Sequence, residues 1–157
     1  MIDTTKVANR RKVHYDTLQD LGADAERLAA SPKLRSVGNW SPGQIFKHVA
    51  IVMHGCIDGF DAKAPWYIRL IMRPLRGWIL NRPMPPGYKL PPDAEAVLIP
   101  GETSLEEGLD LFRKGIHRLQ TETTRQASPF LGKLTVDEWN KLHLRHAELH
   151  PSFLVEE

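Results

Sequence analysis

Hydrophobic positions recur at helical spacing in four stretches of the chain. The stretches cover residues 17–30, 41–59, 104–119 and 135–153, and within each the apolar side chains stand three or four positions apart. The last three stretches open with a Ser or Thr followed three positions later by Gln or Glu, which is the pattern of a capping box. The pattern therefore predicts four amphipathic helices.

Residues 65–102 interrupt this pattern. Residues 66–80 are compatible with a short helix broken at Pro74 and Gly77, and the prolines that follow predict no regular structure: Pro83, Pro85, Pro86, Pro91, Pro92 and Pro100. The first two helices, and likewise the last two, have short connections, which predict antiparallel pairs. We therefore expect an all-α four-helix bundle, up-down-down-up, with a long Pro-rich crossover between the second and third helices. Residues 1–157 would form one domain.

Composition narrows the class of protein. A length of 157 residues predicts one domain, and a net charge of +2 without a long basic run does not favour a nucleic-acid partner. The single cysteine, Cys56, excludes an internal disulfide. The N-terminus lacks the apolar core of a signal peptide, and no apolar run has the length of a transmembrane segment. We expect a soluble, cytoplasmic protein.

The histidines carry the candidate chemistry. His143, His146 and His150 fall within a face of the last predicted helix about 60° wide, and His48 lies at the edge of the apolar stripe of the second. Helical bundles build metal sites from side chains on facing helices. His48, His146 and His150 therefore predict a mononuclear divalent-metal site with an open ligand position, with Zn or Ni ahead of Fe or Cu. The same spacing also fits hydrogen-bonded core histidines.

Two motifs resemble a known family. Gly38-Asn-Trp-Ser-Pro-Gly-Gln-Ile-Phe-Lys-His-Val-Ala50 is similar to the entry into the second helix of the DinB/YfiT-like metalloenzyme superfamily, in a branch of unknown function. Ser128-Pro-Phe-Leu-Gly-Lys-Leu-Thr-Val-Asp-Glu-Trp139, with the three histidines after it, is similar to the C-terminal signature. The resemblance implies a four-helix bundle with a crossover, and a divalent metal on His48, His146 and His150. Many members resemble thiol-dependent transferases and isomerases, and many form dimers.

One residue departs from the branch. Pro151 directly follows His150, and proline disfavours helical geometry in the residue before it. Ligation by His150 could weaken, in which case His143 could substitute for it. Otherwise we expect His143 to orient one of the metal-binding histidines without binding the metal itself. Glu148 points away from this face and is expected in solvent, and Cys56 is expected to be a buried, inert thiol.

The function expected from these observations is that of a metal-dependent enzyme, a thiol-dependent S-transferase acting with a low-molecular-weight thiol. No catalytic residue beyond the metal ligands is assigned. Arg69, Arg73 and Arg76 would form a basic stripe that could hold an anionic substrate. One alternative is a non-catalytic metal-binding or stress-associated interaction protein on the same fold. Another is a peripheral membrane module that uses residues 66–80.

Overall fold

The computed structural model describes residues 1–61, 64–88 and 92–156, and these are mostly helical. The α-helices are α1 (Leu18–Ala29), α2 (Pro42–Asp58), α3 (Trp66–Met72), α4 (Arg76–Leu80), α5 (Pro92–Leu98), α6 (Leu105–Thr121) and α7 (Val136–Leu149). Two short 3-10 helices, η1 (Thr4–Lys6) and η2 (Pro151–Phe153), and two strands, β1 (Leu34–Ser36) and β2 (Leu154–Glu156), complete the elements. The all-α expectation holds in this coarse sense, with a small sheet in addition.

The long helices begin where the sequence predicts. Ser41 caps α2 and Thr135 caps α7, and in both cases the side chain three residues later accepts a hydrogen bond from the backbone N–H of the cap. Ser104 caps α6 by accepting from the backbone N–H of Glu107. Thr17 forms a further capping box at the start of α1. Because these bonds join residues three apart, they fix the helix starts locally.

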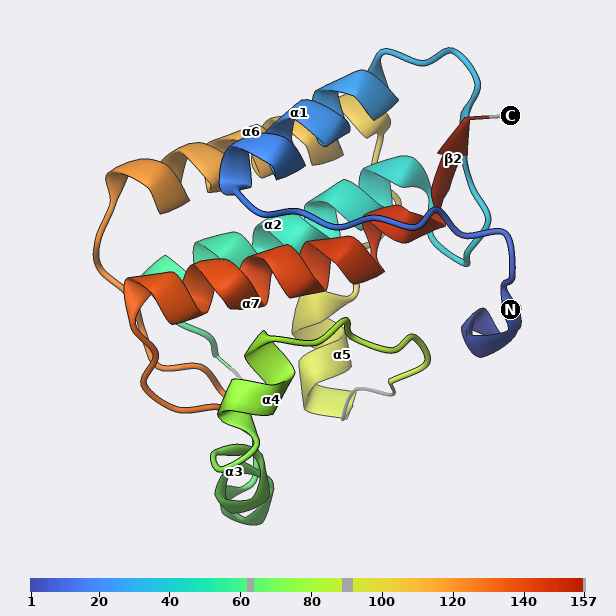
Figure 1. The fold of residues 1–157 in the computed structure, drawn as a ribbon. Coiled ribbons are helices and arrows are strands. Elements are labelled where there is room, and N and C mark those ends of the chain that lie inside the picture. Colours follow the sequence, from blue (N-terminus) through green and yellow to red (C-terminus); the bar gives the residue numbers. More distant parts are fainter. Residues whose placement is uncertain (62–63, 89–91, 157) are drawn as a thin grey trace.

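The four long helices surround the core. In Figure 1, α1 and α7 run in one direction and α2 and α6 in the other. Phe46, Met53, Phe112 and Trp139 are buried between them. The backbones of α2 and α6 approach closely at two glycines, because a Cβ on Gly108 would stand 2.2 Å from the carbonyl oxygen of Gly43. That approach needs a residue without a side chain.

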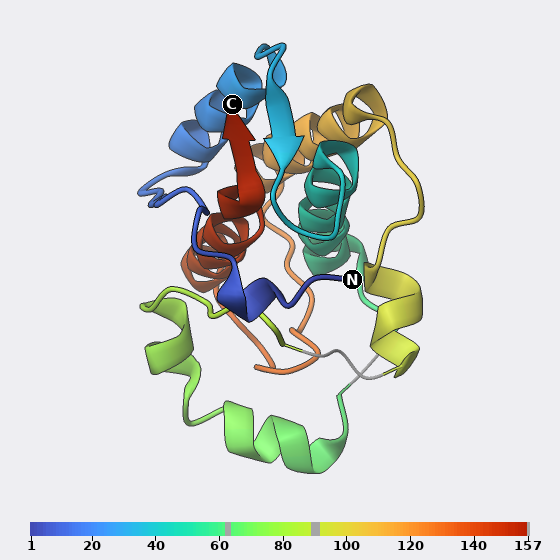
Figure 2. The same ribbon diagram turned by 90° about the vertical axis from the view of Figure 1, so that its right-hand side faces the viewer.

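A short antiparallel pair of strands holds the C-terminal segment. Leu34, Arg35 and Ser36 of β1 pair with Glu156, Val155 and Leu154 of β2. The helical pattern of the sequence did not predict this sheet. Because Pro151 opens a 3-10 turn after α7, the chain turns and runs back beside the α1–α2 connection (Figure 2). The sheet therefore fixes the end of α7 against the start of α2.

Two expectations from the sequence were wrong. The Pro-rich crossover contains α5, because Pro92 occupies the first turn of the helix, where a missing N–H costs nothing.

Glu148 is buried, with an exposed fraction of 6%. Its Oε1 accepts from the backbone N–H of Tyr15 at 2.9 Å and lies 2.7 Å from Nη2 of Arg145. The N-terminal segment runs close to α7 (Figure 1), and the hydrogen bond from Tyr15 holds it beside Glu148.

No helix in the described part of the chain combines the length and the apolar character needed to cross a membrane.

Candidate metal centre

Three histidines from α2 and α7 meet in one cluster. Nε2 of His48 lies 3.1 Å from Nε2 of His146. The ring of His150 is 4.3 Å from that of His48 and 4.6 Å from that of His146, centroid to centroid. One nitrogen from each ring lies within 4.8 Å of the other two. The structure therefore brings together His48, His146 and His150, the three residues that the sequence selected.

The proline after His150 does not remove its ring from this cluster. The backbone of His150 keeps helical angles, with φ −73° and ψ −52°, and its N–H donates to the carbonyl of His146 at 3.3 Å. Pro151 then opens η2 instead of continuing α7. The helix ends at this point, but the turn that holds His146 and His150 one above the other is complete.

A backbone carbonyl from α5 fixes the proton on His48. Nδ1 of His48 lies 2.7 Å from the carbonyl oxygen of Leu98. Because a carbonyl can only accept, Nδ1 carries the proton, and the lone pair of Nε2 points into the cluster. This orienting bond on the far nitrogen is the arrangement that metal-binding histidines use. No sequence pattern indicated this role of Leu98, because every residue has a backbone carbonyl.

The spacing and the hydrogen bonding fit one bound ion. Two imidazole ligands at the usual Zn–N distance and a tetrahedral angle stand about 3.3 Å apart. The observed separation between His48 and His146 is 3.1 Å. Nδ1 of His146 is buried and has no hydrogen-bond partner among the described residues. The proton of neutral His146 therefore lies on Nε2, where it donates to the lone pair of His48 Nε2, and a bound metal ion would take the place of that proton.

Burial keeps the cluster neutral. Loss of solvent lowers the pKa of His48 and, more strongly, the pKa values of His146 and His150, and repulsion between the rings adds to the effect. Trp40 covers the cluster by stacking on His150, with 5.4 Å between ring centroids and an interplanar angle of 16°. A neutral imidazole is the form that binds a metal, so protons compete weakly for this site.

His143 lies one turn earlier on α7 and makes a different contact. Its Nε2 is 3.2 Å from Sγ of Cys56, and the thiol donates to the carbonyl of Met53 at 3.1 Å. Nε2–H of His143 therefore donates to the sulfur. Burial lowers the pKa of His143 to about 3 and raises the pKa of Cys56 to about 12. Both groups are neutral near pH 7, which agrees with the buried, inert thiol expected for Cys56.

The contact between Cys56 and His143 was missed by sequence reasoning. The two residues are 87 positions apart, and neither apolar stripe indicates which turn of α2 meets which turn of α7. The ring of His143 also stacks on Trp139, with 5.3 Å between centroids. Nδ1 of His143 and Nδ1 of His146 are both buried without a hydrogen-bond partner among the described residues, so this feature does not separate the two residues. What separates them is the partner of Nε2, which is Cys56 for His143 and His48 for His146.

The predicted arginine stripe lies towards the other end of α7. Arg76 is 3.2 Å from Glu138 in the first turn of that helix and donates to the carbonyl of Lys133. Arg73 lies against Gly132 in the preceding turn. Glu138 and His146 are about 12 Å apart along the axis at 1.5 Å per residue. Anion binding by Arg69, Arg73 and Arg76 stays a prediction.

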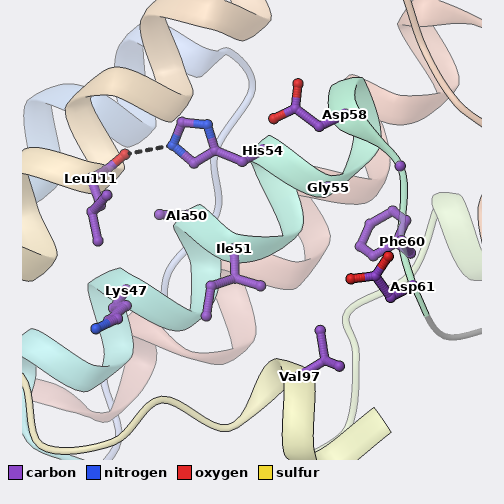
Figure 3. Close-up of a pocket in the computed structure, with 11 residues that line it drawn as sticks. Lys47, Ala50, Ile51, His54, Gly55, Asp58, Phe60, Asp61, Val97 and Leu111 are labelled. Atoms are coloured by element: carbon purple, nitrogen blue, oxygen red, sulfur yellow. Dashed lines mark hydrogen bonds between the residues drawn. The ribbon is translucent and has the colours of Figure 1, made fainter.

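A hollow of about 280 Å³ opens beside α2 and contains none of the three clustered histidines (Figure 3). The side chain of Val97 lines it, while the next residue, Leu98, bonds to His48, so α5 separates the hollow from the cluster. His54 borders the hollow, and its Nε2–H donates to the carbonyl of Leu111 at 3.2 Å. His54 is half-buried.

Comparisons with known proteins place the chain in a family without assigning it an activity. No curated protein and no solved structure matches it. A family model described as "Protein of unknown function (DUF1569)" matches residues 7–157. Since the match covers nearly the whole chain, the protein belongs to the DUF1569 family.

Proposed function

We propose that this protein holds one divalent metal ion on His48, His146 and His150. The observation that carries the proposal is the convergence of three imidazoles from two helices, with the proton of His48 held on the far nitrogen by Leu98. The proposal includes the DinB/YfiT-like four-helix bundle, up-down-down-up, in which α1, α2, α6 and α7 are the four helices.

The three imidazole nitrogens favour some metal ions over others. Three imidazole nitrogens suit borderline transition metals, and no carboxylate or thiol belongs to the cluster in the described part of the chain. Zn or Ni is the metal proposed first, with Fe or Cu after them. Magnesium and calcium prefer oxygen ligands and are not proposed.

We propose further that the site is catalytic, as a thiol-dependent S-transferase. Three protein ligands would leave at least one position open on the metal. A thiol or water that coordinates at this position would have its pKa lowered by the metal. Trp40 stacks over His150 and keeps bulk water from the rings. Because the thiol of Cys56 is buried, with its pKa raised to about 12, the nucleophile would come from a low-molecular-weight thiol in solution.

A second candidate is a non-catalytic metal-binding or stress-associated interaction protein. What supports it is the make-up of the cluster, which brings no general acid or base beside the three histidines among the described residues. Both candidates need the metal, and only the first needs turnover. The cytoplasmic location and the homodimer expected from the sequence also stay proposals.

Elemental analysis tests the metal site. Protein expressed and purified without a metal-affinity tag should contain about one equivalent of metal per chain. His146→Gln and His150→Gln should lower this content at least tenfold. His117→Gln, which changes an exposed histidine on α6, is the matched control and should not. Unchanged metal content in His146→Gln protein would show that the ligands are assigned wrongly.

An activity screen then separates the two candidates. The loaded protein is mixed with a panel of low-molecular-weight thiols and electrophilic acceptors, and consumption of thiol is followed. Turnover that is lost in His146→Gln and kept in His117→Gln supports the transferase. Full metal occupancy without turnover across the panel would favour the non-catalytic candidate.

A further inference from the structure

The crossover carries large apolar side chains into solvent. We call residues 64–82 the arm; it comprises α3, α4 and the residues that join and flank them. The exposed fraction is 74% for Trp66, 66% for Leu70 and 57% for Trp78, and Tyr67, Ile71 and Leu75 are also exposed. Scattered single exposures are ordinary, but this many in one short segment mark a surface that binds something apolar.

The exposed side chains of α3 share one face of the helix. Trp66, Tyr67, Leu70 and Ile71 follow the spacing i, i+1, i+4, i+5, whereas Ile68 and Met72 fall on the other side of the helix and are half-buried. Figures 1 and 2 both show α3 at one end of the molecule, on the opposite side from α1 and α6. The apolar face therefore points away from the protein core.

Positive charge accompanies this face. The sequence from residue 62 to residue 92 contains no Asp or Glu, and it contains six cationic residues: Lys63, Arg69, Arg73, Arg76, Arg82 and Lys89. Arg73 and Arg82 are exposed, and the guanidinium of Arg82 lies 5.3 Å from the centre of the Trp78 ring. Arg76 turns towards Glu138, and Arg69 is half-buried. The arm thus presents tryptophans and arginines together.

We propose that the arm binds the surface of an anionic lipid membrane. Tryptophan favours the boundary between headgroups and acyl chains, and exposed arginines are attracted to anionic headgroups. Since no described helix is suited to cross a membrane, α3 and α4 would lie in the plane of the interface. A second copy of the chain fits this surface less well, because two arms face to face would oppose like charges with no acidic residue between them.

Vesicle sedimentation of the full-length protein tests the proposal. The protein should bind vesicles that contain phosphatidylglycerol or phosphatidylserine more tightly than vesicles of phosphatidylcholine alone, and added salt should weaken the binding. Emission from the tryptophans should shift to the blue on binding, because Trp66 and Trp78 leave water. This readout does not depend on the metal, so its failure and the failure of the metal site are distinguishable.

Paired variants locate the contact. The double variant Trp66→Ser, Leu70→Ser should lose binding to anionic vesicles without unfolding, since both side chains are already exposed. Arg73→Gln with Arg82→Gln should weaken binding about 30-fold, at about fivefold for each cation at the surface. Lys33→Gln with Lys114→Gln removes the same charge from exposed sites outside the arm and should bind as the wild type does. Thermal melts verify that each variant folds.

Three results would overturn the proposal. The first is absence of binding to anionic vesicles at low salt. The second is equal binding by the wild type and by the Trp66→Ser, Leu70→Ser variant. The third is a dimer, seen by sedimentation velocity without lipid, that the same variant dissociates while no vesicle binding occurs; the arm would then be an interface between two copies.

Discussion

The buried histidines should make the metal-free protein sensitive to acid at a pH where carboxylates do not yet titrate. Burial lowers the pKa values of His48, His143, His146 and His150 in the folded protein. The unfolded chain keeps a histidine pKa near about 6.5. Below that pH the unfolded chain binds more protons than the folded protein does. The stability due to the neutral rings is therefore complete above pH 6.5 and is lost as the pH falls.

The size of the effect follows from the number of protons. Each proton bound only by the unfolded chain changes the free energy of unfolding by about 1.4 kcal/mol per pH unit. Four such histidines give a slope of at most about 5 kcal/mol per pH unit, reached when all four are neutral in the folded protein and protonated in the unfolded chain. A domain with a free energy of unfolding of about 5–15 kcal/mol would lose all of it within about one to three pH units. Carboxylates titrate near about pH 4 and contribute little to the first part of this loss.

Urea unfolding in a chelating buffer, followed by tryptophan fluorescence between about pH 8 and pH 5, measures the slope. His143→Phe keeps an aromatic ring beside Trp139 and removes one proton site, so the slope should fall by about 1.4 kcal/mol per pH unit. His117→Gln, at an exposed site, should leave the slope unchanged. A wild-type slope below about 1.4 kcal/mol per pH unit in this range would refute the reasoning, because the rings would then accept protons in the folded state.

Three further substitutions test the fold and the cover of the site. Gly108→Ala should cost about 2 kcal/mol of stability, because the new Cβ meets the carbonyl of Gly43. Gly22→Ala, at a position with open space around it, should gain up to about 1 kcal/mol. Equal effects of the two substitutions in urea unfolding would contradict the close approach of α2 and α6. Glu148→Gln should cost about 2 kcal/mol and expose the N-terminal segment to trypsin, and an unchanged digestion pattern would count against that anchor. Trp40→Ala should weaken zinc binding about tenfold in competition with a chromophoric chelator, and undiminished affinity would show that the stacked ring does not support the site.

Local chemistry let the sequence determine the long helices and the face that carries the histidines. The hydroxyl of Ser41 caps α2 through a residue three positions away, and Thr135 does the same for α7. Helical periodicity alone places His146 and His150 one above the other, since one turn separates them. These features need no knowledge of the rest of the chain.

Tertiary structure decided what surrounds those elements. The carbonyl of Leu98 sets the tautomer of His48, and Cys56 accepts a hydrogen bond from His143. Glu148 is buried because the N-terminal segment covers it, although helical spacing turns it away from the histidines. The physical reason is the same in each case. A backbone carbonyl or a neighbour from a distant part of the chain leaves no periodic pattern in the sequence, and only the packed fold brings it within reach.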